Sequence, residues 1–427
     1  MKKRISVWML CILLLSGSVA GCSSVQSTDN SAYVMSLGID IGEEKAFAFT
    51  FQIPYLINET GASEQAKFYS ITCEAASLSD AIGIINSNTT YSISLSSLNF
   101  FVISDRVATR EVLERLLPSL MKLPQLKKSA FLIVAKDSAK DYIEGLESDK
   151  QSNLDKIQSQ LIQEADTSGI YPKCTLLDAF ECLLDDRMEI LCALGAKNPH
   201  SDDAQRKESF STEGDQEEEK QVLASLQNDK DSRFYIDYTA GDIVRKGGLG
   251  SDLMGSAVFL QGDLKAYLTG RETLFVQMAN GAFRNATYYM EYPPTDGSLM
   301  LHLKQDGSPK TKVSIQDGTV QIDEKIPLKV EVYSYTGLDR IYSKEEQEQM
   351  RQYIQTHLHQ GIEQMVEKLQ NIGADVFGYG RDVCKLFSTQ KAWEDFQWRR
   401  HFPNAQVSIE VELKLERMYF DPQEEVQ

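Results

Sequence analysis

The longest helical pattern in the chain is SKEEQEQMRQYIQTHLHQGIEQMVEKLQNIG, residues 343–373. Ser343 and Glu346 have the spacing of a capping box, which predicts the start of a helix. Apolar residues then recur every three to four positions, at Met350, Tyr353, Ile354, Leu358, Ile362, Met365, Val366, Leu369 and Ile372. This stripe predicts one long amphipathic helix that packs on a large apolar surface.

The segments on either side of this helix supply a candidate for that surface. Four runs before the helix have the pattern of strands separated by glycine turns, at 285–292, 297–304, 310–317 and 319–335. They predict an antiparallel meander, one face of which can cover the helix. After the helix, residues 391–401 predict a short helix and residues 405–416 a last strand that can join the same sheet.

The turn Asp375-Val-Phe-Gly-Tyr-Gly380 ends the long helix. Gly378 and Gly380 permit the positive φ angles that such a turn needs, and Phe377 would then be buried. On this interpretation the turn is a structural motif. The alternative is that it contacts a partner directly, and the sequence leaves both interpretations open.

The N-terminal half alternates strands and helices. Residues 33–41 and the period-two run 46–54 predict a hairpin, in which Asp40 lies at a strand end. An acid there can be catalytic, but a turn-forming role is favoured. Further strands are expected at 68–74, 98–104, 130–135 and 188–194, with helices between them. The sequence therefore predicts an α+β fold with mixed or antiparallel sheets in more than one domain.

The first residues have the pattern of an export signal. Lys2, Lys3 and Arg4 precede an apolar run over 5–15, which is too short to span a membrane. Val19-Ala20-Gly21-Cys22 matches the lipobox of bacterial lipoproteins. We therefore expect cleavage between Gly21 and Cys22 and a lipid on the Cys22 thiol. An ordinary signal peptide with an incidental Cys22 is the alternative.

Composition shifts along the chain predict its organisation. A small, polar tether follows the lipobox, and an acidic stretch near the middle reads as a solvated linker rather than a cation site. The expected segments are a signal at 1–21, a tether at 22–31, a domain at 32–195, the linker at 196–232 and a second domain at 233–427.

The charge and the cysteines exclude several classes of function. Loss of the signal takes the net charge from −18 to −21, which disfavours nucleic acid as a partner. Five further cysteines remain, and they have no zinc-binding spacing. We interpret them as buried small hydrophobes, with a disulfide as the open alternative. No His-Glu-x-x-His or Gly-x-Ser-x-Gly motif occurs, so the sequence predicts no enzyme, no metal and no cofactor.

These segments together resemble the Ger(x)C lipoproteins, the C subunits of spore germinant receptors. In the N-terminal half the resemblance lies in the lipobox, in the run from Gly38 to Gly42 and in the strands at 98–104 and 130–135. Ser23-Ser24 stand where the family commonly has a Trp-Asp pair. The acidic linker is also longer than usual in the family.

The C-terminal half carries the more specific resemblance. Gly255-Ser-Ala-Val-Phe259, followed by Asp263 and Glu272, resembles the strand-turn-strand signature of the family. The turn at 375–380, followed by Trp393, resembles its most recognisable motif.

The resemblance implies a non-enzymatic subunit that nutrient-triggered spore germination requires. It would lie on the outer face of the inner spore membrane, held by the lipid on Cys22, and assemble with integral-membrane A and B subunits. Binding of the small-molecule germinant by this subunit is not expected. Two other classes stay open. A solute-binding lipoprotein of an uptake system would show two similar α/β lobes around a cleft, and a secreted hydrolase would carry a dispersed site.

Overall fold

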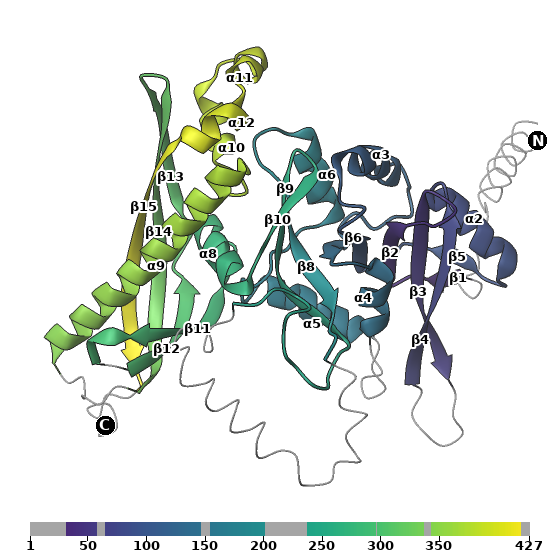
Figure 1. The fold of residues 1–427 in the computed structure, drawn as a ribbon, viewed down its shortest axis with the longest axis horizontal. Helices are drawn as coiled ribbons and strands as arrows, with labels where there is room; N and C mark the ends of the chain where they lie inside the picture. Colours follow the sequence, from purple (N-terminus) through teal and green to yellow (C-terminus); the bar gives the residue numbers. More distant parts are fainter. Residues whose placement is uncertain are drawn as a thin grey trace, which may run out of the picture.

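The computed structural model describes residues 31–57, 65–146, 154–200, 237–295, 297–336 and 343–419. They form two α+β domains, each built on one large sheet (Figure 1). The expected multidomain α+β fold with a long helix near the C-terminus is confirmed. The signal, all but the last residue of the tether, and most of the acidic linker lie outside the described residues.

The N-terminal domain is built on an eight-stranded mixed sheet in the order β10-β9-β8-β7-β6-β2-β3-β4. Strands β2, β6, β7 and β8 run parallel, and the pairs at both edges are antiparallel. The central strands are apolar at nearly every position, as expected for strands covered on both faces. The strands are β2 (Ser36–Ile41), β3 (Phe47–Ile57), β4 (Gln65–Ala75), β6 (Phe100–Ser104), β7 (Phe131–Ala135), β8 (Leu191–Lys197), β9 (Ser251–Leu260) and β10 (Asp263–Leu268).

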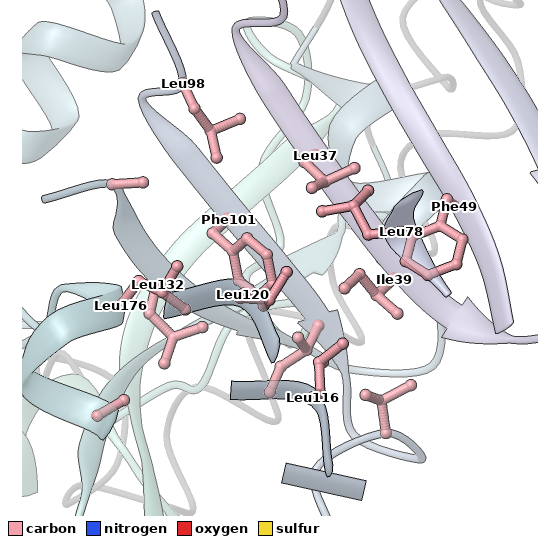
Figure 2. Close-up of a cluster of buried hydrophobic side chains, with 14 of the residues drawn as sticks. Leu37, Ile39, Phe49, Leu78, Leu98, Phe101, Leu116, Leu120, Leu132 and Leu176 are labelled. Atoms are coloured by element: carbon pink, nitrogen blue, oxygen red, sulfur yellow. The ribbon is translucent and has the colours of Figure 1, made fainter. Parts of the chain in front are cut away.

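Helices cover both faces of this sheet and create two cores. On one face, Phe101 and Leu132 point into a cluster with Leu120 and Leu176 (Figure 2). On the other face, Phe100 and its neighbours pack against α4 (Ala139–Gly145) and α5 (Leu154–Ala165). The helices are α2 (Leu78–Asn88), α3 (Arg110–Met121) and α6 (Leu176–Leu184) on the first face, and α4 (Ala139–Gly145) and α5 (Leu154–Ala165) on the second.

A small separate sheet lies where the described chain begins. Strand β1 (Ser31–Tyr33) pairs in parallel with β5 (Ser92–Ser94). The next residues lead directly into β2, so the described residues begin at one edge of the N-terminal domain. Figure 1 shows β1, β5 and α2 at the end of the molecule opposite the C-terminal sheet.

The C-terminal sheet is organised by its longest strand, β14 (Thr319–Tyr335). β12 and β13 pair with successive parts of β14, and β15 pairs with it in parallel. The expected addition of the last strand to this sheet is therefore confirmed. The other strands are β11 (Asn285–Tyr292), β12 (Gly297–Gln305), β13 (Lys310–Gln316) and β15 (Gln406–Met418).

The expected turn at Gly307 does not reverse the chain. β12 and β13 are both antiparallel to β14, so they run in the same direction along it. They form one long strand interrupted at residues 306–309. Asp306 lies in this interruption and pairs with Lys329 and Lys414, at 3.1 and 2.6 Å, which ties the break to the two neighbouring strands.

The long helix α9 (Lys344–Ile372) packs on one face of this sheet, as its apolar stripe predicts. Ser343 and Glu346 form the expected capping box. A second helix, α8 (Gly270–Asn280), lies against α9 and is almost wholly buried. Because this core also contains Leu191 and Val258 of the N-terminal sheet, the two domains share apolar contacts.

Two elements differ from the expectations. β9 and β10 extend the N-terminal sheet, although the expected boundary at residue 233 places them with the second domain. More than 50 residues lie between β8 and β9, so no local sequence pattern indicates that these two strands pair. The helix expected over 391–401 is broken at Gln397, whose φ of 52° separates two short helices. The remaining helices are α10 (Tyr379–Val383), α11 (Gln390–Phe396) and α12 (Trp398–His401), with 3-10 turns at Pro293–Thr295, Cys384–Leu386 and Phe402–Asn404.

Candidate functional site

The turn that follows α9 is built around the buried carboxylate of Asp375. Its Oδ1 accepts the backbone N–H groups of Gly378 and Tyr379, at 2.9 and 3.2 Å. Its Oδ2 accepts the N–H of Gly380 at 2.8 Å and the indole N–H of Trp398 at 2.9 Å. Asp375 thus satisfies the free donors at the start of α10, in the manner of a capping residue.

The two glycines of this turn are required for different reasons. Gly378 has a φ of 76°, in the left-handed region that residues with a side chain adopt at a cost. Gly380 has no room for a side chain, because a Cβ there would lie 2.5 Å from Nε1 of Trp398 and 2.6 Å from the Arg187 carbonyl oxygen. The positive φ expected at both glycines is found at Gly378 only, whereas Gly380 is needed for the space it leaves.

A second buried acid lies beside the turn. The Tyr379 hydroxyl donates to Oε2 of Glu324 on β14 at 2.7 Å. Burial raises the pKa of Glu324 to about 7, against the opposing effect of this hydrogen bond. Burial also raises the pKa of Asp375 to about 6, although its four N–H donors favour the charged form. These oxygens bind the chain's own donors, which fits a structural role better than a catalytic one.

Aromatic side chains enclose the turn. Phe377 stacks on Tyr379 with ring centroids 5.1 Å apart, and Trp398 packs on Phe402 at 5.7 Å. Trp393, which the sequence singled out, is 1% exposed and belongs to the same cluster. Phe377 is half-buried at the edge of the cluster rather than fully buried as expected.

The turn and this cluster contact the segment that leads into β8 of the N-terminal domain. The backbone N–H of Glu189 donates to the Asp375 carbonyl at 2.8 Å. Arg399 Nε lies 2.5 Å from Oε1 of Glu189, and the Trp393 indole donates to Asp186 at 2.7 Å. We call residues 185–190 together with residues 375–380 and 393–399 the joint, because they connect the two domains.

Glu189 is the central polar residue of the joint. It is 3% exposed, and its second carboxylate oxygen accepts the backbone N–H of Gln261 at 2.8 Å. Burial raises its pKa, while the Arg399 guanidinium opposes that effect. Glu189, Arg399 and Asp186 could not be predicted from the sequence, because no local pattern indicates contacts between residues 207 and 210 positions apart.

The N-terminal motif residues lie in another place. Both carboxylate oxygens of Asp40 accept backbone N–H groups at the start of α4, from Ala139 at 2.8 Å and Lys140 at 3.0 Å. A Cβ at Gly38 would lie 2.8 Å from the Ile143 side chain, so β2 and α4 pack closely. Asp40 therefore acts as a helix cap here, rather than as a turn former or a catalytic acid.

Gly255 also has a structural position. It lies in β9, its N–H donates to the Ile170 carbonyl at 2.9 Å, and a Cβ would meet the Leu268 carbonyl oxygen at 2.2 Å. Its neighbours are backbone groups of β10 and of the loop before α6, which favours a structural role for Gly255.

The cysteines and histidines of the described residues form no metal site. No group of three or more His, Cys, Asp or Glu side chains that could hold a metal occurs among them. Cys174 and Cys192 are buried with their sulfurs 3.6 Å apart, and all five described cysteines are free thiols. His357 lines a cavity of about 370 Å³ between α8 and α9. Burial, and then Arg271, lower its pKa to about 4, so this imidazole stays neutral.

Gly21 and Cys22, the expected cleavage and lipid-attachment residues, lie outside the described residues. Within the part of the chain that is described, no helix is both long and apolar enough to cross a bilayer.

The fold and the joint define a class: a two-domain α+β protein in which the polar groups of the turn at 375–380 bind the chain's own donors. Comparison with known families identifies it further. Residues 25–194 match the family described as spore germination protein N-terminal domain, and residues 254–419 match spore germination B3/GerAC like, C-terminal. The chain belongs to this GerAC-like family of spore germination proteins, which is a non-enzymatic family.

Solved structures and curated proteins give two further comparisons. A solved structure described as the crystal structure of the GerBC protein is similar, with 12% identity and a TM-score of 0.48, over 89% of this chain and 96% of that one. No curated protein matches the sequence.

Proposed function

We propose that this chain is the lipid-anchored C subunit of a spore germinant receptor. It would be held on the outer face of the inner spore membrane by the lipid on Cys22 and would assemble with integral-membrane A and B subunits. The observation that carries this proposal is the order of segments. The lipobox ends at Cys22, and the match to the N-terminal germination domain begins at residue 25.

The physical role of the anchor is to keep an acidic protein at a membrane. A net charge of −21 after processing opposes binding to anionic lipid head groups. Each buried methylene contributes about 0.8 kcal/mol, so two or more acyl chains are enough for stable attachment. The lipid therefore supplies an attraction to the membrane that most of the acidic protein surface lacks.

Labelling with palmitate tests the anchor. The wild type and Cys384→Ala should take up label and fractionate with membranes, because Cys384 is a half-buried thiol of the folded domain. Cys22→Ala should take up none and stay unprocessed. Equal labelling of Cys22→Ala and the wild type would contradict attachment at Cys22.

Assembly needs a separate experiment. Detergent extracts of spore membranes should yield the chain together with two integral-membrane proteins, and loss of the chain should abolish the response to nutrients. A solute-binding lipoprotein is disfavoured because the C-terminal sheet is largely antiparallel and the two domains are unlike. Tight binding of an amino acid or a sugar by the purified chain, measured by calorimetry, would favour that alternative instead.

A further inference from the structure

The edge of the N-terminal domain where the chain begins has an unusual surface. Ser31 lies opposite Ser92, next to Tyr91, which is 49% exposed. Ile84, on the outer side of α2, is 43% exposed. The side chains of Ile84 and Tyr91 are thus exposed to solvent close to the point where the tether joins the fold.

This surface also lacks charge. The sequence contains no Asp, Glu, Lys or Arg from residue 81 to residue 104, in a chain of which 25% is charged. Asp80, in the first turn of α2, is exposed, but from residue 81 onwards the exposed positions of α2 and of the loop after it are Gly, Ser, Asn, Thr, Ile and Tyr. Nothing in the packing demands this, because these side chains face solvent.

The neighbouring loop, between α3 and β7, is basic. Residues 116–136 contain no acid, and Lys122 and Lys128 in this loop are exposed. The loop lies beside the uncharged segment, because the Lys127 backbone N–H donates to the Leu95 carbonyl at 3.4 Å and its side chain to Asn99 at 2.9 Å.

Two acids, Asp80 and Asp155, lie at the border of this surface, and both accept hydrogen bonds. Asp80, in the first turn of α2, accepts the Ser77 hydroxyl at 2.8 Å. Asp155, at the start of α5, accepts the side-chain N–H of Asn99 at 3.1 Å. The edge is therefore neutral to basic in a protein whose charge is otherwise strongly negative. We call residues 84–99 and 122–128 the loop edge.

The tether limits where the loop edge can be. Eight residues, 23–30, separate Cys22 from Ser31. A fully extended chain spans at most about 3.5 Å per residue, so a lipid on Cys22 would hold Ser31 within roughly 30 Å of the bilayer. This step rests on the proposed lipid attachment.

We propose that the loop edge is the face that the N-terminal domain turns towards the phospholipid bilayer. Tyrosine side chains favour the interface between water and lipid, where the ring is partly buried and the hydroxyl stays hydrated. Lysines near such a surface are attracted to anionic head groups. The acidic remainder of the protein is repelled from the same head groups, so both effects favour one orientation.

Tryptophan quenching by brominated lipid tests this orientation. After removal of the signal the chain holds only Trp393 and Trp398, each 1% exposed, so an added tryptophan reports its own position. The full lipidated chain would carry Ile84→Trp or Tyr91→Trp, with Ile315→Trp as control. Ile315 is 38% exposed on β13 of the other domain. Each variant is added to phosphatidylcholine–phosphatidylglycerol vesicles, with and without brominated chains.

The loop-edge variants should lose fluorescence in brominated vesicles, and the control should not. Adding Lys122→Glu and Lys128→Glu should reduce that loss, and the effect should disappear in vesicles without phosphatidylglycerol. Equal quenching at all three positions in a chain that carries lipid and floats with the vesicles would overturn the orientation. An absence of quenching in Ile84→Trp and Tyr91→Trp would also overturn the orientation, and the loop edge would then be free to bind a protein partner. A chain without lipid would instead contradict the proposed function.

Discussion

Arg399 of the C-terminal domain and Glu189 of the N-terminal domain form an ion pair of 2.5 Å between Nε and Oε1. Glu189 is buried, whereas the Arg399 side chain is 28% exposed. Removal of the arginine would leave a buried carboxylate with its backbone donor alone. The pair thus makes the joint between the domains sensitive to a single substitution.

Arg399→Ala should lower the free energy of unfolding by about 2 to 3 kcal/mol, because it leaves Glu189 without its charged partner. Arg400→Ala, at the exposed neighbouring position, is the matched control and should change little. Urea unfolding followed by tryptophan fluorescence measures both. In the double variant with Glu189→Gln the losses should not add. Additive losses would show that the two residues do not interact.

Asp375→Asn should destabilise the turn by about 2 kcal/mol, because one of its oxygens becomes an NH₂ group facing N–H donors. Four donors, including the Trp398 indole, meet this carboxylate in the wild type. Asp382→Asn, on the short helix α10 that Asp375 caps and bonded to Lys385, is the control. Chemical denaturation of the two variants should separate them clearly. Equal stability would contradict the capping role of Asp375.

The two glycines of the turn should respond differently to alanine. Gly378→Ala places a side chain at a φ of 76°, but its nearest neighbour would be the Met188 sulfur, at 3.4 Å, so it should cost about 1 kcal/mol. Gly380→Ala forces Trp398 and the Arg187 carbonyl apart and should cost about 2 to 3 kcal/mol. Protein abundance in spores should fall in the same order. Normal abundance with lost germination in Gly378→Ala would indicate a partner contact instead.

The stability of the C-terminal domain should fall as the pH rises from about 5 to 8. The pKa of Glu324 is about 7 in the folded protein, above its ordinary value of 4.5. Between these two values the folded state binds more protons than the unfolded state, so stability decreases with pH. The effect should be about 2 to 3 kcal/mol.

Glu324→Gln keeps an acceptor for the Tyr379 hydroxyl and cannot ionise. It should therefore weaken the pH dependence, leaving the part that Asp375 contributes because its pKa is also raised, to about 6, and be the more stable protein at pH 8. Urea titrations of both proteins at several pH values would decide this. An unchanged slope in the variant would place the titrating group elsewhere.

The parts of the fold that were predictable are those encoded by local pattern. Ser343 with Glu346 marked the start of α9, and apolar alternation located the strands of the C-terminal sheet to within a residue or two. The break at 306–309 was misread because Gly307 looks like a turn, whereas the pairing of β13 with β14 keeps the strand direction.

The joint was predictable only in part. Asp375, Gly378 and Gly380 form a local motif, and their short spacing indicated a turn. Their partners Trp398 and Glu189 lie 23 and about 190 residues away in sequence, and no periodicity links them. The same reason hid the pairing of β9 with β8, which follows the long acidic segment.

The central claim is that a lipid on Cys22 holds a non-catalytic subunit beside integral-membrane partners. Intact-mass spectrometry of the chain, purified with its companions from spore inner membranes, tests it most directly. The account predicts a polypeptide that starts at Cys22, carries the added mass of a diacylglyceryl group and co-purifies with two multispanning proteins. An unmodified chain recovered without membrane companions would contradict it.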